Sequence, residues 1–196
     1  MPGKYRRLRS KKSKLPMIIF GSGLIIFSLF MLFVFSNQPG KTDTSSIQQR
    51  GSYVVPMPVA YPAPELTLEN VNGRFESLED YRGQVVLVNN WATWCPPCKA
   101  EMPTLVDFYN DHSGDGLDVI AIEAGEPKDY VLQFVEEFRL PFSVWLDPNS
   151  MALDAFNNPN LPSSYVIDRK GIIRYTWTGE INREMLEKYV TPLLSE

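Results

Sequence analysis

A strand of the buried type runs directly into a pair of cysteines, and this junction constrains the fold more than any other part of the sequence. Residues 84–91 read QVVLVNNW, an almost continuous apolar and β-branched run that is typical of a strand covered on both faces. Cys95 and Cys98 follow, and a helical stretch extends from them to about Asn110. This order of strand, cysteines and helix predicts that Cys95 lies at a helix N-terminus.

The remainder of the C-terminal part alternates between strand and helix patterns. Asn72-Gly73 is a strong hairpin signal between two short alternating runs. We therefore expect an α/β domain with a mixed central sheet and helices on both faces. The expected strands are 65–78 (as a hairpin), 117–124, 142–147, 164–168 and 172–178, and the expected helices are 127–140, 149–157 and 182–194.

The cysteine pair admits three interpretations. Structural zinc requires four ligands, whereas the chain offers Cys95, Cys98 and a single histidine, His112, in a turn-like stretch where we expect it at the surface. A structural disulfide across two intervening residues restricts the unfolded chain little, and 196 residues can form a core without it. Redox chemistry, with no metal, explains the pair best.

The position of the cysteines assigns their roles. Unsatisfied amides at a helix N-terminus favour an anion, so Cys95 is the predicted nucleophile in its thiolate form. Cys98 lies one turn further on and is the predicted resolving cysteine. Pro96 and Pro97 fall where missing amide hydrogens cost least and stiffen the loop. Trp94 shields the site or offers a contact surface, although an aromatic residue there is also compatible with ordinary packing.

The segment VVLVNNWATWCPPCKAEMP resembles the active-site segment of thioredoxin-like proteins, and most closely that of the membrane-anchored TlpA/ResA-like thiol-disulfide oxidoreductases. A second segment, NLPSSYVIDRKGIIRY, resembles the family's loop with a cis-proline and places that proline at Pro162. The resemblance implies that Pro162 and the adjacent Leu161 contact the partner's chain, and that Pro162 keeps metal away from the thiols. It covers roughly residues 63–194.

The resemblance also implies a role for Glu101, which matches a glutamate just after the family's motif. Glu101 is expected to shuttle a proton as Cys98 attacks the mixed disulfide, or to adjust thiol ionisation; the competing interpretation is a solvated surface glutamate. Plain thioredoxins have a buried aspartate where this chain has Asn89. Glu123 follows a predicted strand and either faces the site or simply ends the strand.

Three further positions bear on the resemblance. Asn90 stands where the family usually has phenylalanine, which puts the packing beneath the site in doubt. Pro103 matches the proline that kinks the first helix. An extra helix and strand across about 127–146 match the insertion of the TlpA/ResA-like subgroup.

The N-terminal part has the pattern of a membrane anchor. Its first 14 residues contain seven Lys or Arg and no acid, and the next stretch, to Phe35, has an uncharged run long enough to cross a bilayer as a helix. A cleaved signal peptide is the alternative, but FVFSNQPGK offers no A-x-A site. We expect a cytoplasmic tail (1–15), a single-pass signal-anchor helix in the cell membrane (16–36), a flexible tether (37–62) and an extracytoplasmic thioredoxin-like domain (63–196).

Charge excludes some partners. Seven of the 19 Lys and Arg residues precede residue 15, so the rest of the chain carries 12 basic residues against all 23 acidic ones. An acidic domain argues against binding to nucleic acid and against electrostatic binding to anionic lipid.

The resemblance implies a reductant of protein disulfides whose substrates include apocytochrome c before haem attachment. Its electrons would come from an integral membrane thiol carrier, and its redox group would be the Cys95–Cys98 disulfide with no separate cofactor. A thiol peroxidase of the same fold is one alternative, although NWATWC lacks the P-x-x-x-T-x-x-C pattern. A disulfide-donating oxidant and a tethered binding module with incidental cysteines are the others.

Overall fold

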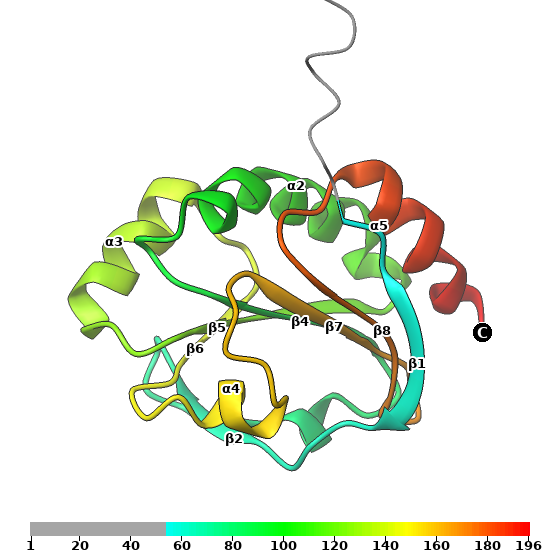
Figure 1. Cartoon of the computed structure of the whole chain (residues 1–196), viewed down its shortest axis with the longest axis horizontal. Coiled ribbons are helices and arrows are strands. Elements are labelled where there is room, and N and C mark those ends of the chain that lie inside the picture. Colours follow the sequence, from blue (N-terminus) through cyan, green and yellow to red (C-terminus); the bar gives the residue numbers. More distant parts are fainter. Residues whose placement is uncertain (1–53) are drawn as a thin grey trace, which may run out of the picture. The chain divides into compact units, whose positions relative to one another are not determined.

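An eight-stranded mixed sheet forms the centre of the computed structural model, which describes residues 54–196 (Figure 1). The predicted tail, signal-anchor helix and most of the predicted tether lie outside this range. Within residues 54–196, no helix combines the length and the apolar character that a membrane span requires.

The strands are ordered β1-β8-β7-β4-β5-β6-β2-β3 across the sheet. β4 pairs parallel with β5, and β5 pairs parallel with β6, while the other pairings are antiparallel, so the predicted mixed sheet is confirmed. The bounds are β1 (Met57–Pro62), β2 (Thr67–Asn70), β3 (Phe75–Ser77), β4 (Val85–Trp91), β5 (Leu117–Glu123), β6 (Ser143–Leu146), β7 (Ser163–Ile167) and β8 (Ile172–Thr178).

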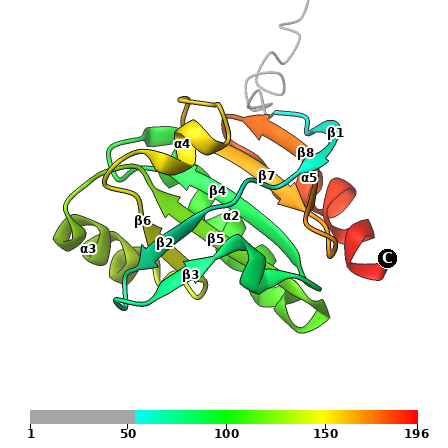
Figure 2. The same cartoon turned by 90° about the horizontal axis from the view of Figure 1, so that it is seen from below.

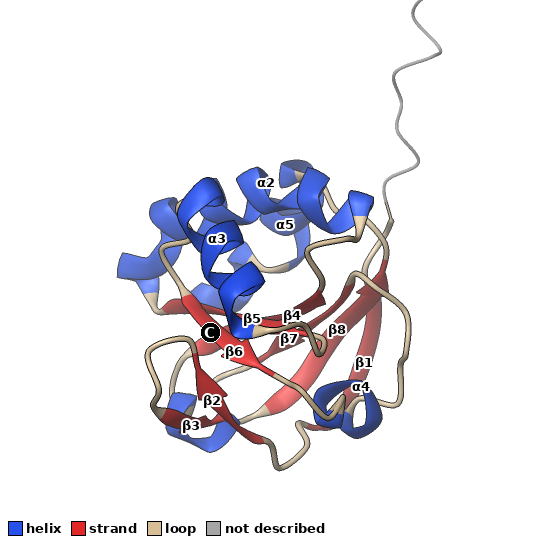
Figure 3. Ribbon diagram, turned by 90° about the vertical axis from the view of Figure 1, so that its left-hand side faces the viewer, coloured by secondary structure: helices blue, strands red, loops and turns tan. Residues whose placement is uncertain are grey.

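Helices cover both faces of the sheet, as predicted (Figure 3). One face carries α2 (Pro96–His112), α3 (Lys128–Phe138) and α5 (Arg183–Tyr189), and the other carries the short α4 (Met151–Ala155). The predicted extra helix and strand are α3 and β6. Short 3-10 helices span Leu78–Tyr81, Ser113–Asp115 and Thr191–Ser195.

The sheet begins earlier than the sequence indicated. β1 lies within the range 37–62 that we expected to be a tether, and it pairs antiparallel with β8 at the edge of the sheet (Figure 2). Its sequence, MPVAYP, hid the strand because proline is unusual in sheets, but an edge strand tolerates proline where no ladder bond is needed. The ordered sheet therefore starts at Met57 and not near Ala63.

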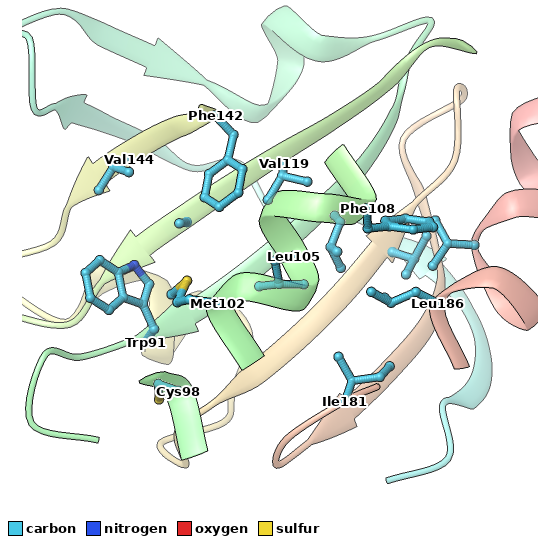
Figure 4. Packing of buried hydrophobic residues seen from close by; sticks show 14 of the residues in the cluster. Trp91, Cys98, Met102, Leu105, Phe108, Val119, Phe142, Val144, Ile181 and Leu186 are labelled. Carbon is cyan, nitrogen blue, oxygen red and sulfur yellow. The ribbon is translucent and has the colours of Figure 1, made fainter. Parts of the chain in front are cut away.

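Two apolar clusters, one on each face, fix the sheet between its layers. All seven residues of β4 are buried, which confirms the doubly covered strand expected from its sequence. Figure 4 shows the cluster beneath α2, where Met102, Leu105 and Phe108 pack toward the sheet and Cys98 lies at its margin near Trp91. The cysteine motif is thus anchored to the core by the helix that it begins.

The predicted hairpin around Asn72-Gly73 is formed by β2 and β3. A half-buried carboxylate, that of Glu76, fastens it to the sheet by accepting hydrogen bonds from the Tyr81 hydroxyl (2.8 Å), the Ser143 hydroxyl (2.8 Å), Trp145 Nε1 (2.9 Å) and Asn70 Nδ2 (2.5 Å). Burial opposes ionisation of Glu76, but these four donors outweigh it and lower its pKa.

Candidate active site

Cys95 and Cys98 form a disulfide at the start of α2. Cys95 is the N-cap residue, and its Sγ accepts a hydrogen bond from the backbone N–H of Cys98 at 3.3 Å. Pro96 and Pro97 occupy the first turn, where a helix has no use for their missing amide hydrogens. The predicted N-terminal position of Cys95 is confirmed, and amides that point at its sulfur favour a thiolate there once the disulfide is reduced.

The sulfurs themselves are covered, while their surroundings are open. Cys95 is only 3% exposed and Cys98 is fully buried, whereas the adjacent Trp94 is 66% exposed. Pro96 is also exposed, and Pro97 is half-buried. A partner would therefore meet the tryptophan and the first proline before it reaches a sulfur atom.

The loop before β7 lies at the same end of the sheet. The Leu161–Pro162 peptide bond is cis, as the resemblance implied. Ser163, the next residue, pairs with Asn90 near the end of β4, which places this loop beside the segment that leads into the cysteines. Pro162 is buried and Leu161 is half-buried.

Glu101 is buried in the face of α2 that packs on the sheet. It is fully buried, so the interpretation as a solvated surface glutamate is wrong. Its carboxylate accepts hydrogen bonds from Asn89 Nδ2 (2.8 Å) and from the backbone N–H of Ile181 (3.2 Å). Burial raises the pKa of Glu101 to about 8, against the opposing effect of these two donors, with Glu180 raising it further. The group therefore holds a proton at neutral pH, one turn beyond Cys98.

The two asparagines of β4 serve opposite faces of the sheet, since successive side chains of a strand alternate. Asn89 faces α2 and also donates to the Ser164 hydroxyl at 2.9 Å. Asn90 donates to the Ser163 hydroxyl at 3.3 Å. The asparagine that replaces the usual phenylalanine at position 90 thus contacts the start of β7, and the polar contact with Glu101 comes from Asn89.

Thr93, two residues before Cys95, makes a further set of contacts that the sequence did not indicate. The Glu126 carboxylate accepts hydrogen bonds from the Thr93 backbone N–H (2.6 Å) and the Thr93 hydroxyl (2.5 Å). The backbone N–H of Glu126 donates to both carboxylate oxygens of Glu123, at 3.1 and 3.0 Å. The sequence left open whether Glu123 faces the site or simply ends its strand, and the structure places it, fully buried, as the last residue of β5. Nothing in the loop sequence signals Glu126.

His112 does not lie in a surface turn. It is the last residue of α2, and its side chain is 15% exposed between Asp115 and Glu187. Its ring also packs against Phe108, with centroids 4.7 Å apart. Pro103, by contrast, lies inside α2 as expected. The structure therefore assigns His112 to the packing of α2 and α5, at the far end of α2 from the cysteines.

Comparison with known proteins identifies the family. Residues 59–176 match the AhpC/TSA family. The chain is 36% identical over 132 residues to the thiol-disulfide oxidoreductase ResA of Geobacillus kaustophilus (strain HTA426), a match that covers 67% of the chain and 76% of that relative. ResA of Bacillus cereus (strain ATCC 10987 / NRS 248) is 30% identical over 166 residues, which are 85% of the chain and 94% of that relative.

A similar solved structure supports the same family and shows its fold. The crystal structure of a thiol:disulfide interchange protein of the thioredoxin family from Chlorobium tepidum TLS superposes with a TM-score of 0.64 at 25% identity, covering 69% of this chain and 97% of that one. The thioredoxin-like fold is thus established for the described domain. The chain belongs to the AhpC/TSA family and, within it, to the TlpA/ResA-like thiol-disulfide oxidoreductases.

Proposed function

We propose that the protein is a membrane-tethered reductant of protein disulfides on the extracytoplasmic side, with apocytochrome c before haem attachment as a candidate substrate. The observation that carries the proposal is the placement of Cys95 at the N-cap of α2, next to the exposed Trp94 and at the same end of the sheet as Pro162. This arrangement offers a nucleophile to an extended partner chain. The direction of electron flow and the substrate rest on the resemblance.

The exchange proceeds in two steps. The Cys95 thiolate attacks one sulfur of the substrate disulfide, a mixed disulfide forms, and the other substrate sulfur leaves as a thiolate that takes up a proton. The Cys98 thiolate then attacks Cys95 Sγ and releases the second substrate thiolate. The products are a substrate dithiol and the Cys95–Cys98 disulfide, which an integral membrane thiol carrier must reduce again with two electrons and two protons.

Glu101 takes part in the second step of the proposal. Cys98 is buried, so its proton cannot pass directly to bulk water. The base is the ionised form of Glu101, one turn away, which accepts the Cys98 proton and becomes the neutral acid that burial favours, with a pKa raised to about 8.

Membrane attachment rests on the sequence of the N-terminal part. The basic cluster followed by an uncharged apolar run supports a signal anchor with a cytoplasmic N-terminus. The match to Bacillus cereus ResA over 166 residues is longer than the described range 54–196, so it includes part of the N-terminal segment. Labelling of the reduced cysteines by a membrane-impermeant maleimide in intact cells tests the orientation. Labelling only after lysis would contradict it.

The reduction potential tests the direction. A reduction potential of about −270 mV or lower, measured in glutathione or dithiothreitol buffers, is expected for a reductant. A value near about −120 mV would instead indicate a disulfide donor.

A trapping variant tests the substrate class. Cys98→Ala cannot resolve the mixed disulfide and should accumulate covalent complexes with substrate proteins, including apocytochrome c if the candidate is correct. The Cys95→Ser, Cys98→Ser double variant is the control, because it forms no such complex. An empty trap in intact cells would contradict protein substrates, and a double variant that still complements a deletion would indicate a binding module.

A thiol peroxidase is tested separately because the family match includes the AhpC/TSA description. The Thr93 hydroxyl donates to Glu126 in this structure, and it stands two residues before Cys95 and not at the position of the peroxidase pattern. We expect no peroxide consumption above the rate of free dithiol. Rapid turnover of peroxide with thiol recycling would favour the peroxidase.

A further inference from the structure

We propose that Glu123 is a positioning residue of the dithiol site: its carboxylate fixes the backbone at Glu126, and the Glu126 carboxylate in turn holds Thr93, two residues before Cys95. The inference concerns the geometry of thiol-disulfide exchange at Cys95 and is independent of the direction of electron flow. It extends the site beyond the cysteine motif to the loop that follows β5.

The first link joins β5 to the loop behind it. Glu123 is fully buried, and both of its carboxylate oxygens accept from the Glu126 N–H. The main chain of the same residue is also occupied, because its carbonyl accepts from the Asp147 N–H at 3.0 Å. Glu123 therefore cannot turn away from the loop without leaving a buried carboxylate with no donor, which is costly.

The second link joins that loop to the cysteine segment. The Glu126 carboxylate accepts both the N–H (2.6 Å) and the hydroxyl (2.5 Å) of Thr93. The parallel pairing of β4 and β5 continues between them, since the Ala124 N–H donates to the Trp91 carbonyl at 2.9 Å. Only Trp94 then separates the held residue from Cys95. We call the two hydrogen bonds from Thr93 to the Glu126 carboxylate the Glu126 clamp. The clamp limits how far Cys95 can move from the amides of α2 that favour its thiolate.

The charges around Glu123 define how it responds to pH. Glu126 in the loop is the acidic group that acts on Glu123 directly, and two other buried acidic groups, Glu101 on α2 and Asp147 after β6, lie on neighbouring elements. Asp147 is occupied by the N–H groups at the start of α4, and Glu101 by Asn89 and Ile181. Burial, with a further contribution from Glu126, raises the pKa of Glu123 to about 7, against the lowering effect of the backbone donors. The ionised, stronger acceptor therefore predominates above that pH.

The test is the alkylation rate of Cys95 by iodoacetamide in the reduced full-length protein, followed by mass spectrometry from pH 6 to pH 9. Glu123→Leu keeps the bulk and removes both acceptors, while Glu123→Gln keeps one acceptor and removes the charge. Because the clamp is lost, we expect Glu123→Leu to slow alkylation about threefold or more, with a smaller effect for Glu123→Gln. A role of the negative charge alone would make alkylation faster, so a faster or unchanged rate overturns the proposal.

A double-mutant cycle tests the pathway. Thr93→Val removes the hydroxyl donor, and it should slow alkylation in the same direction as Glu123→Leu. If Glu123 acts through the clamp, the double variant should be little slower than the slower single variant. Independent roles would instead make the two effects multiply, which would overturn the proposal.

Two further variants serve as controls. Glu126→Gln changes the half-buried residue between Glu123 and Thr93, and it tests the proposal even if Glu123→Leu does not fold. It should slow the alkylation of Cys95, as Thr93→Val does. An unchanged alkylation rate would count against the proposal. Glu137→Gln, an exposed position on α3, makes the same charge change away from the loop and should leave the rate unaltered. A slower rate in Glu137→Gln as well would show that the slowing is not specific to the loop after β5 and would overturn the proposal.

Discussion

Glu101 and Glu123 are carboxyl groups without exposed surface, and they lie on α2 and at the end of β5. Burial is the largest cause that raises the pKa of each group, to about 8 for Glu101 and to about 7 for Glu123. Both side chains are therefore protonated to a larger extent near neutral pH than an exposed glutamate would be.

The first prediction concerns the stability of the disulfide form with pH. Because the folded pKa of Glu101 is raised, the folded state binds more protons than the unfolded state between about pH 4.5 and about pH 8. The contribution of Glu101 to the free energy of unfolding should therefore fall as pH rises through this window, by about 1.4 kcal/mol for each unit of the shift. Urea unfolding at several pH values measures it.

Glu101→Gln provides the comparison for this prediction. The amide oxygen can accept from the Ile181 N–H, and rotation of the Asn89 amide can bring Asn89 Oδ1, which has no hydrogen-bond partner in the described domain, toward the new NH₂ group. The free energy of unfolding of Glu101→Gln should change less between pH 5 and pH 8 than that of the wild type. An identical slope in both proteins would show that Glu101 does not titrate in this range.

The second prediction concerns Trp94, which is 66% exposed beside Cys95. Trp94→Ala should change the free energy of unfolding by less than about 0.5 kcal/mol, because little packing is lost. Reduction of a protein disulfide should require about fivefold more substrate for half-maximal rate, whereas reaction with glutathione disulfide should be unchanged. Equal effects on both substrates would assign Trp94 to the environment of the sulfur and not to partner binding.

At the scale of elements, the β2–β3 hairpin depends on one carboxylate. Glu76→Ala leaves the hydroxyl of Tyr81 and the amide of Asn70 without their acceptor, so the third prediction is a loss of about 2–3 kcal/mol in urea unfolding at pH 7. The exposed Glu65→Ala is the control and should be nearly neutral.

The pH dependence gives this prediction a second readout. Because the folded pKa of Glu76 is lowered, its stabilising effect is present above the unfolded value near 4.5 and is lost as pH falls through the folded value. The difference between wild type and Glu76→Ala should therefore narrow in acid. A constant difference down to pH 2 would mean that the ionised form is not what fastens the hairpin.

Local patterns predicted those elements whose residues repeat with the period of their structure. The continuous run of β4, the Asn72-Gly73 turn and the helical stripe of α3 all matched the structure. β1 was missed because two prolines interrupt its pattern, and it is stabilised by pairing with β8 and by the packing of Val59 on the core. Pairing between segments distant in sequence leaves no local signal.

The same limit applies to the candidate active site, where only the placement that follows from the order of the elements could be predicted. A strand, a cysteine pair and a helix are consecutive, so the placement of Cys95 followed from their order. The burial of Glu101 and the clamp between Glu126 and Thr93 depend on how α2 and the loop after β5 pack against β4. Neither spacing nor composition carries that information.

At the scale of the whole described domain, β1 protects the edge of the sheet. Its burial is slight, so the fourth prediction is a modest loss of stability when residues 54–62 are removed: about 1–2 kcal/mol, or a fall in Tm of about 2–8 °C. The uncovered β8 edge should also increase aggregation, measured by light scattering during heating. A chain that begins at Val54 is the matched control, and equal Tm and scattering in the two chains would contradict the role of β1.

The two ends of the described domain differ in their distance from the chemistry. The Val54 N–H donates to the Glu180 carbonyl, and Gly179 donates to the Pro162 carbonyl at 2.8 Å, so the chain enters beside the cis-proline loop. Glu196 instead lies 3.7 Å from Arg174, near the β7–β8 turn at the opposite end of these strands. A fluorophore or surface linkage attached at the C-terminus would therefore leave the dithiol free, whereas a bulky group fused just before Val54 would crowd an incoming partner.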